Sequence, residues 1–385
     1  MSRCLVIVGL VVLALQGGVA QAQWYASADF MAPKRSINTD AVFQREVASE
    51  STRTVDFSTT TTATPVGNGE FETVVVETPV RIEDYTETFV GDQVLSTSDI
   101  DFGRASAGRF TVGRRFGDFG LESSFLWTES WEGGAAVTDP NGNLVGPFVR
   151  PGTLLSEEIR IETIPGGTTD DLFTYPELEN LNTFAEIDYE SKLMTGDINA
   201  VGVLIEGGRG TVTGLAGFRF AELDEQFGYR SVSAEPDVDN SVNSPAQDTA
   251  VRNRLFGPQI GLMIASPITE RAFLTLSAKA AIAYNDVERR TLWQPDTTDT
   301  NGVDVIHSRD STTSLLGDFS IGGNFFVTRN LAIRFGFDVL AIGDVALAPD
   351  NFRTDIESIG SNDHRVNHRS RVAYYSPTIG AMLSF

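Results

Sequence analysis

Charged side chains recur at alternate positions in several segments of this sequence, on the polar face of each segment. Carboxylates and cations arranged in this way can line an aqueous path and select solutes, or they can pair with each other and close the space between the segments. We take the following residues as candidates for such an interior: Asp29, Arg109, Glu122, Glu186, Asp188, Glu190, Lys192, Arg219, Lys279, Asp318, Arg334 and Asp338.

The composition excludes two large classes of protein. The chain has 385 residues with 29 Lys and Arg against 52 Asp and Glu, a net charge of −23. Because binding to phosphates requires clustered basic side chains, we expect no nucleic-acid partner. After the first 15 residues no apolar run reaches the 18 or so residues of a membrane-spanning helix. The mean hydropathy of −0.08 is compatible with a membrane protein only if the membrane is crossed by alternating strands.

The first 22 residues are typical of an export signal. A basic start at Arg3 precedes the apolar run Cys4 to Leu15, and Ala20 to Ala22 has the small residues of a cleavage site. We therefore expect residues 1–22 to be a cleaved signal peptide and residues 23–385 to form the mature domain. Since Cys4 is the only cysteine, the exported protein would have neither disulfides nor cysteine-bound metal.

The candidate residues lie in segments whose apolar residues alternate with polar ones. In Ala272 to Asn285, apolar side chains share one face and Lys279 lies on the other, which is the period of a β-strand. Most of the segments exceed the five or six residues of an ordinary strand and reach the nine to eleven or so needed to cross a bilayer. We predict ten strands: Trp24–Ala32, Gly103–Arg115, Phe119–Trp131, Thr183–Leu193, Thr211–Leu223, Leu255–Ala265, Ala272–Asn285, Thr313–Val327, Leu331–Gly343 and Arg371–Phe385.

The connections between these segments alternate between long and short. This pattern is typical of an outer-membrane barrel with long external loops and short periplasmic turns, whereas a soluble β-sandwich does not require it. Only the predicted turn Met194 to Gly210 is longer than expected. The acidic residues are concentrated in the long loops, and the longest acidic loop is expected at residues 34–102, as a lid, a plug or an extra hairpin.

The C-terminal segment ends in an aromatic residue that closes an alternating strand. Ile379, Ala381, Leu383 and Phe385 share one face, and such an ending resembles the signal by which the barrel-assembly machinery recognises its clients. We expect these four residues to act as that signal.

Five stretches of the chain resemble a known family. They are WYASADFMAP at Trp24, SAGRFTVGRRFGDFGLE at Ser106, GFRFAELDEQF at Gly217, RNRLFGPQIG at Arg252 and RFGFDVLAIGDVALAP at Arg334. Together they resemble the outer-membrane β-barrel porins of the planctomycete type and, more loosely, the major outer-membrane protein type of Legionella. The resemblance implies an outer-membrane barrel with a porin-like role, and it implies no particular solute.

The width of the lumen decides between transport and a structural role. Ten strands make a barrel slightly wider than the eight-stranded kind, whose interior is filled by side chains. A further hairpin, for instance at Gly152 to Ile164, would raise the count to twelve and favour a pore. The sequence therefore leaves a narrow diffusion channel and a closed barrel both open.

Three histidines, His307, His364 and His368, fall in predicted external loops. Asp363 and His364, with Asp304 and Asp310, invite comparison with outer-membrane proteases, which use carboxylates and a histidine at the extracellular rim. Their spacing does not support that chemistry, and the sequence has no G-x-S-x-G, Walker or H-E-x-x-H motif. We expect no enzyme, no cofactor and no metal.

The sequence thus predicts an all-β, antiparallel up-and-down transmembrane barrel of about ten strands, exported to the outer membrane. The expected function is porin-like passive diffusion of small hydrophilic solutes. The alternatives are a closed structural or adhesive surface barrel and, less favoured, a rim protease. The expected partners are the lipid bilayer, the barrel-assembly machinery and small solutes, while the oligomeric state stays open.

Overall fold

The computed structural model describes residues 23–36, 41–52, 55–66, 70–147, 154–163, 167–174, 181–208, 210–233, 245–294, 304–352 and 365–385. The predicted signal peptide, residues 1–22, lies outside this part of the chain. Within the described residues, no helix is long and apolar enough to cross a membrane.

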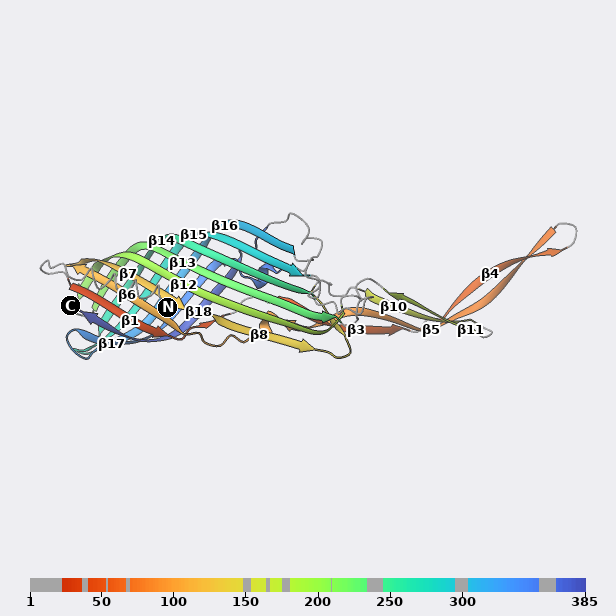
Figure 1. Cartoon of the computed structure of the whole chain (residues 1–385), viewed down its shortest axis with the longest axis horizontal. Helices are drawn as coiled ribbons and strands as arrows, with labels where there is room; N and C mark the ends of the chain where they lie inside the picture. Colours follow the sequence, from red (N-terminus) through yellow and green to blue (C-terminus); the bar gives the residue numbers. More distant parts are fainter. Residues whose placement is uncertain are drawn as a thin grey trace.

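Ten antiparallel strands close into a ring (Figure 1). The ring closes because β1 pairs with β18 on one side and with β6 on the other. The predicted fold class and strand number are therefore confirmed. In ring order the strands are β1 (Gln23–Met31), β6 (Ala107–Phe116), β7 (Phe119–Thr128), β12 (Leu181–Gly207), β13 (Gly210–Ser233), β14 (Ala246–Pro267), β15 (Ala272–Gln294), β16 (Asp304–Phe326), β17 (Leu331–Val345) and β18 (Ser370–Ser384).

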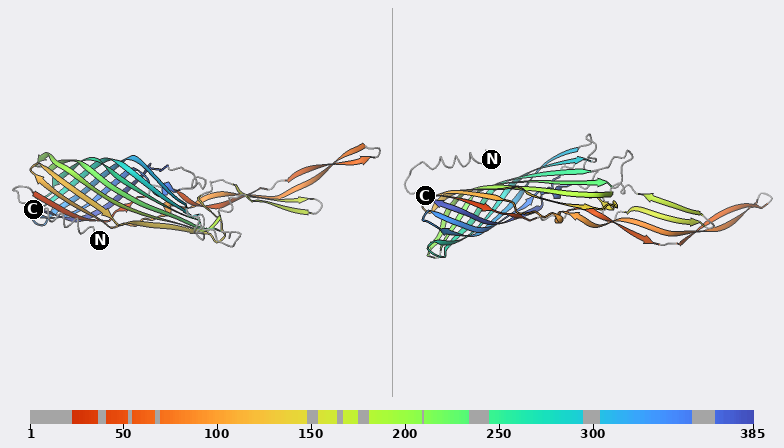
Figure 2. Two further views of the ribbon diagram at one scale, coloured as in Figure 1. Left: turned by 45° about the horizontal axis from the view of Figure 1, so that its top comes forward. Right: turned by 60° about the horizontal axis from the view of Figure 1, so that its bottom comes forward.

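Short turns lie at one end of the barrel. The start of β1 and the end of β18 also meet at this end. The Trp24 amide donates to the Phe385 carbonyl at 2.8 Å, and the Phe385 amide donates back to the Trp24 carbonyl at 2.9 Å. Between β6 and β7 the chain reverses at Gly117, whose φ of +67° favours glycine. We call this the turn end of the barrel. The strands reach it tilted across the barrel (Figure 2).

The predicted turn from Met194 to Gly210 is wrong. This stretch continues β12 to Gly207, and it stays paired with β13 and β7, as at Asp197 opposite Arg219 and Gly202 opposite Phe119. Glycines and inward polar residues interrupt the apolar pattern here and make the strand look like a turn. The strict alternation of long and short connections therefore has no exception.

An apolar belt surrounds the barrel toward its turn end. On β14 and β15, for example, Phe256, Ile260 and Ile282 are 58–68% exposed, while Lys279 of β15 points inward to Asp197. Large apolar side chains exposed on every strand of the ring would be unfavourable in water, whereas hydrocarbon solvates them. The belt is the membrane-facing surface of the protein.

The polarity of both faces inverts along the strands, away from the turn end. On β13 the inward residue Arg219 is followed by Leu223 and Phe227, which are fully buried, while the outward residues change from Phe218 to Asp224. The long strands β12 to β16 thus continue past the belt, with an apolar interior and a charged exterior. Sequence alternation predicts only 11–15 residues for each of these five strands, because it treats the apolar face as lipid-facing throughout.

Eight further strands lie beyond the belt: β2 (Lys34–Arg35), β3 (Val42–Thr52), β4 (Val55–Val66), β5 (Glu70–Ser96), β8 (Trp131–Thr138), β9 (Leu144–Val145), β10 (Leu154–Thr163) and β11 (Gly167–Thr174). β8 and β9 pair with β12, and β2 pairs with β18. β3, β4 and β10 all pair with β5, and β11 pairs with β10, so these strands form an arm that extends away from the barrel (Figure 1). Two short 3₁₀ helices, η2 (Thr97–Asp99) and η4 (Pro349–Asn351), complete the described elements.

The hairpin considered at Gly152 to Ile164 does not widen the barrel. β10 and β11 form it, but β10 pairs with β5 of the arm rather than with a strand of the ring. The twelve-stranded alternative is therefore wrong, and the lumen keeps the width of a ten-stranded barrel.

Candidate functional site

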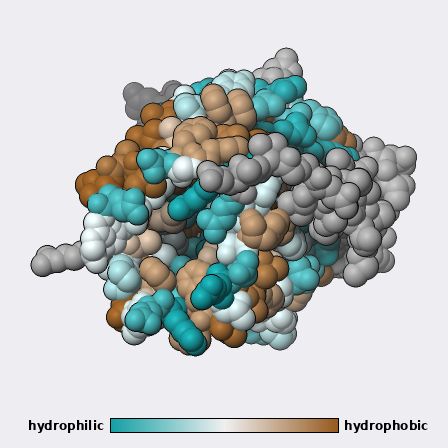
Figure 3. Space-filling view, turned by 90° about the vertical axis from the view of Figure 1, so that its left-hand side faces the viewer, coloured by the Kyte–Doolittle hydropathy of each residue, from teal (hydrophilic) through white to brown (hydrophobic). Residues whose placement is uncertain are grey.

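A polar cavity occupies the lumen at the level of the belt. Its volume is about 490 Å³, and its lining reaches the turn end through Gln23, Arg115 and Arg329. Figure 3 looks onto this end, where hydrophilic residues surround a hollow and hydrophobic residues lie on the outer side. Hydroxyl, amide and charged side chains share its wall with apolar ones such as Leu126, Phe273 and Met382, and we call it the polar cavity because of the charged groups that line it.

Arg109 organises one side of a charged layer that crosses this lumen. Its Nη1 and Nη2 donate to the two carboxylate oxygens of Asp338 at 3.0 and 3.2 Å, and its Nε donates to Asp29 Oδ2 at 3.2 Å. Arg334 Nη1 lies 3.4 Å from the same Asp29 oxygen. Thr378 Oγ1 also donates to Asp338. Strands β1, β6, β17 and β18 are thereby tied together across the interior.

The other side of the charged layer joins strands β12, β13, β15 and β16. Arg219 Nη2 donates to Asp318 Oδ2 at 3.3 Å, and Lys279 Nζ donates to Asp197 Oδ2 at 3.1 Å. Asn199 Nδ2 donates to the second Asp197 oxygen at 2.9 Å. Across the whole layer four cations face four carboxylates, so the pairs neutralise one another within the apolar belt.

Removing one carboxylate from this layer is expected to destabilise the barrel. Asp338→Asn leaves the Arg109 guanidinium without its two-pronged partner, and breaking a buried pair in this way costs about 3–5 kcal/mol. Glu186→Gln is the matched control, because it breaks the ion pair with Arg230 on the outer surface, where the two side chains are 41% and 55% exposed and such a pair contributes about 0–1 kcal/mol. The measurement is the urea midpoint of unfolding in detergent micelles. Equal midpoints for the two variants would contradict the assigned importance of the Arg109 pair.

The structure places eight of the twelve predicted interior residues in the lumen. Seven of them belong to the charged layer: Asp29, Arg109, Arg219, Lys279, Asp318, Arg334 and Asp338. The eighth is Glu122, whose Oε2 accepts a hydrogen bond of 2.7 Å from the Tyr25 hydroxyl. Asp197 completes the layer, and sequence alternation misses it because its segment resembles a turn.

The prediction is wrong for Glu186, Asp188, Glu190 and Lys192. These side chains alternate with the buried residues of β12 and lie on the outer surface of the barrel, where Glu186 pairs with Arg230 at 3.5 Å and Glu190 accepts from Ser130 at 2.6 Å. They lie beyond the belt, where the exterior is charged and the interior is apolar. The predicted alternation is present, but its two faces are exchanged.

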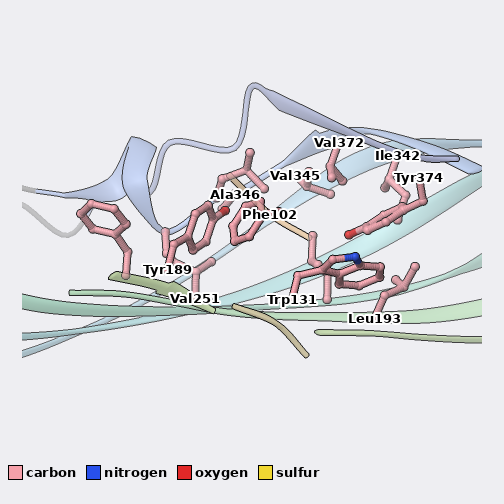
Figure 4. Close-up of a cluster of buried hydrophobic side chains, with 14 of the residues drawn as sticks. Phe102, Trp131, Tyr189, Leu193, Val251, Ile342, Val345, Ala346, Val372 and Tyr374 are labelled. Carbon is pink, nitrogen blue, oxygen red and sulfur yellow. The ribbon is translucent and has the colours of Figure 1, made fainter. Parts of the chain in front are cut away.

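A plug closes the lumen beyond the charged layer. We use this name for residues 33–36, 41–44, 95–105 and 345–352, which fold into the barrel from the β1–β6 and β17–β18 connections. Phe43, Leu95, Phe102 and Leu347 of the plug are each at most 2% exposed and belong to one apolar cluster with inward residues of the ring. Figure 4 shows part of this cluster, where Phe102 lies beside Tyr189 and Trp131 beside Tyr374.

Glu225 of β13 holds both parts of the plug. Its carboxylate pairs with Arg35 and accepts hydrogen bonds from the Tyr189 hydroxyl at 2.6 Å and from the Ala348 amide at 3.0 Å. The Arg35 and Glu225 side chains are 1% and 0% exposed. Burial lowers the pKa of Arg35, but the Glu225 carboxylate together with Tyr189 and Tyr374 more than offsets this effect. The net pKa is raised, so the guanidinium stays charged. The sequence predicts neither residue, because both lie in segments that resemble external loops.

The residues considered for a protease are only partly described. Asp363 and His364 lie outside the described residues. His368 Nδ1 lies 3.7 Å from Asp310 Oδ2 on the outer part of the barrel. Among the described residues, no group of His, Cys, Asp or Glu has the arrangement of a metal site.

The residues expected to form the assembly signal lie on the closing strand. Ile379, Leu383 and Phe385 are each more than half exposed within the belt, and Ala381 lies on the same face of β18. Their role in recognition by the assembly machinery stays a prediction.

Comparison of the sequence with known protein families agrees with this architecture. The sequence model of the family described as Putative beta barrel porin-7 (BBP7) matches residues 58–371. No curated protein matches the chain. Among solved structures, the outer membrane protease OmpT from Escherichia coli is similar over 95% of this chain and 97% of its own, with 11% identity and a TM-score of 0.46. The toluene transporter TodX of Pseudomonas putida is similar over 95% and 90% of the two chains, with 8% identity and a TM-score of 0.29.

Proposed function

The chain belongs to the Putative beta barrel porin-7 (BBP7) family, and from this premise we propose that it is an outer-membrane barrel whose resting state is closed and which carries the arm of strands β3, β4, β5, β10 and β11 on the cell surface. The plug carries the proposal. Its apolar side chains fill the lumen beyond the charged layer, and a hydrated solute cannot pass through a close-packed apolar cluster without displacing it.

Passive diffusion of small hydrophilic solutes is the second candidate function. The polar cavity of about 490 Å³ favours it, because this cavity extends from the turn end past the charged layer to Pro33 and Trp131 and would form part of a channel. In this alternative the plug leaves the lumen during transport and the charged layer selects ions. The proposal includes no catalytic step.

Recording currents across planar bilayers tests the proposal. We expect the folded wild-type protein to give no discrete conductance steps, because the plug blocks the lumen. The second candidate predicts steps, and it predicts that Arg334→Glu shifts their selectivity toward cations because this change adds negative charge to the polar cavity. Steps in the wild-type protein would overturn the closed resting state.

A further inference from the structure

The wall of the barrel is interrupted where β7 ends and β8 begins. β12 pairs with β7 up to Met194 opposite Trp127, and it pairs with β8 from Ser191 opposite Trp131. Between these points the Thr128 hydroxyl takes the place of a neighbouring strand. It accepts a hydrogen bond of 3.0 Å from the Leu193 amide and donates one of 3.1 Å to the Leu193 carbonyl.

The neighbouring strand also ends at this level. β6 pairs with β7 up to Ala107 opposite Thr128, and β8 has β12 as its strand partner on one side only among the described residues. The inner face of β8 is covered by the plug, since a Cβ atom at Gly133 would lie 2.7 Å from Ile100 Cγ2 and 3.1 Å from Phe102 Cδ1. Plug residues therefore pack behind this part of the wall, where β8 has one strand partner.

Two cavities meet at the interruption. Outside the barrel, a groove of about 840 Å³ is lined by Arg104, Phe125, Trp127, Lys192 and Met194, together with further residues of the same segments. The groove and the polar cavity of the lumen share the side chains of one partition, Thr128, Trp131 and Leu193, which line both. A few side chains therefore separate the lumen from the outside.

Trp131 is the largest member of this partition. It is 2% exposed, its Nε1 donates to the Pro33 carbonyl at 3.1 Å, and its ring lies 5.0 Å from the ring of Tyr374. Trp131 thus contacts the plug and, across the lumen, β18. Thr128 and Leu193, in contrast, are held by the hydrogen bonds between them within the wall. Movement of the Trp131 indole would join the two cavities.

The groove has the two environments that an amphipathic molecule requires. Phe125 and Trp127, 36% and 44% exposed, stack at 6.1 Å on the belt side of the groove, next to Met194. Arg104, Glu129 and Lys192 lie on its charged side, beyond the belt. Because the apolar wall is continuous with the belt, molecules dissolved in the membrane reach it directly.

We propose that this groove binds single-chain amphipathic molecules from the membrane, with the apolar tail on Phe125 and Trp127 and the polar head toward Arg104 and Lys192, and that Trp131 closes a lateral passage from the groove to the lumen. The inference goes beyond the proposed function, because it concerns the side wall of the barrel and not the plug-blocked axis.

A cysteine in the lumen tests the passage. In a variant with Cys4→Ser, Ser124→Cys places one thiol in the polar cavity, and the protein is reconstituted in phosphatidylcholine vesicles that contain N-dodecylmaleimide. We expect Trp131→Ala to raise the labelling rate of this thiol about tenfold or more, since truncating a buried Trp removes a large filled volume from the partition. Adding Trp127→Ala should lower the rate again by weakening the groove. Trp131→Phe, which keeps an aromatic ring, should have a smaller effect than Trp131→Ala.

Matched controls separate a lateral passage from general loosening. Ser123→Cys, the adjacent residue on the outer face, should react at the same rate with and without Trp131→Ala. A sulfonated, water-soluble maleimide should label Ser124→Cys from the turn end at an unchanged rate. Either an unchanged dodecylmaleimide rate in Trp131→Ala or an equal acceleration of both reagents would overturn the proposal. Neither result depends on whether the wild-type protein conducts ions.

Discussion

Replacing both parts of the plug by short turns is expected to turn the closed barrel into a conducting one. Met31 and Ala107 are partners in the β1–β6 ladder, so an Asn-Gly turn in place of residues 32–106 keeps both strands in register. Val345 and Ser370 are partners in the same way, and a second Asn-Gly turn can replace residues 346–369. The double replacement leaves all ten strands of the ring and removes the apolar side chains that both connections insert into the lumen.

The expected conductance increases with the number of plug parts that are removed. The wild-type protein should give none, and the double replacement should give discrete steps in planar bilayers, with the single replacements giving smaller or rarer ones. The charged layer stays in place, but it lines the polar cavity, and its Arg334 side chain is 31% exposed even with the plug present. Water and small ions can therefore reach it once the apolar cluster is gone.

A replacement confined to the arm is the matched control. Val47 and Val90 are partners in the β3–β5 ladder, so an Asn-Gly turn in place of residues 48–89 shortens the arm and leaves the plug. This variant should stay closed. Folding of every variant is checked by its altered migration in gels before and after boiling. A folded double replacement without conductance would show that the charged layer, and not the plug, closes the lumen.

The architecture of the barrel could be predicted from the sequence because hydrocarbon imposes a simple rule on the belt. In β15, β16 and β17 the outward residues are apolar and the inward residues include Lys279, Asp318 and Asp338, so alternation alone gives the strands and their faces. The rule fails beyond the belt, where the exterior meets water and the interior is packed. The prediction misplaces Glu186 and Lys192 for this physical reason.

The plug could not be predicted because its central contact joins distant parts of the chain. Arg35 and Glu225 are 190 residues apart, and each lies in a segment whose other charges are exposed. No local periodicity distinguishes these two residues from loop charges. This pair forms in apolar surroundings that arise only in the folded barrel, where Tyr189 and Phe227 are buried on the inner face beyond the belt.

Glu225→Gln is expected to release the plug while the ring stays folded. The change removes the charge that compensates the buried Arg35 guanidinium, and breaking such a pair costs about 3–5 kcal/mol. A penalty of this size shifts the balance between inserted and released plug by roughly a hundredfold or more. The variant should therefore show conductance steps and increased cleavage by external proteases, with an unchanged ring.

A second change distinguishes loss of the ion pair from loss of a hydrogen-bond acceptor. The side-chain amide in Glu225→Gln would still offer one oxygen to the Tyr189 hydroxyl and the Ala348 amide. Adding Arg35→Met removes the guanidinium as well, so the double variant has no buried charge without a partner. Replacing a buried ion pair by groups without charge is often nearly neutral, and the double variant should be closed again. If the double variant conducts as much as Glu225→Gln alone, then the hydrogen-bond acceptors of Glu225, and not its charge, hold the plug. The reason is that the double variant removes the unpaired charge but does not restore the carboxylate.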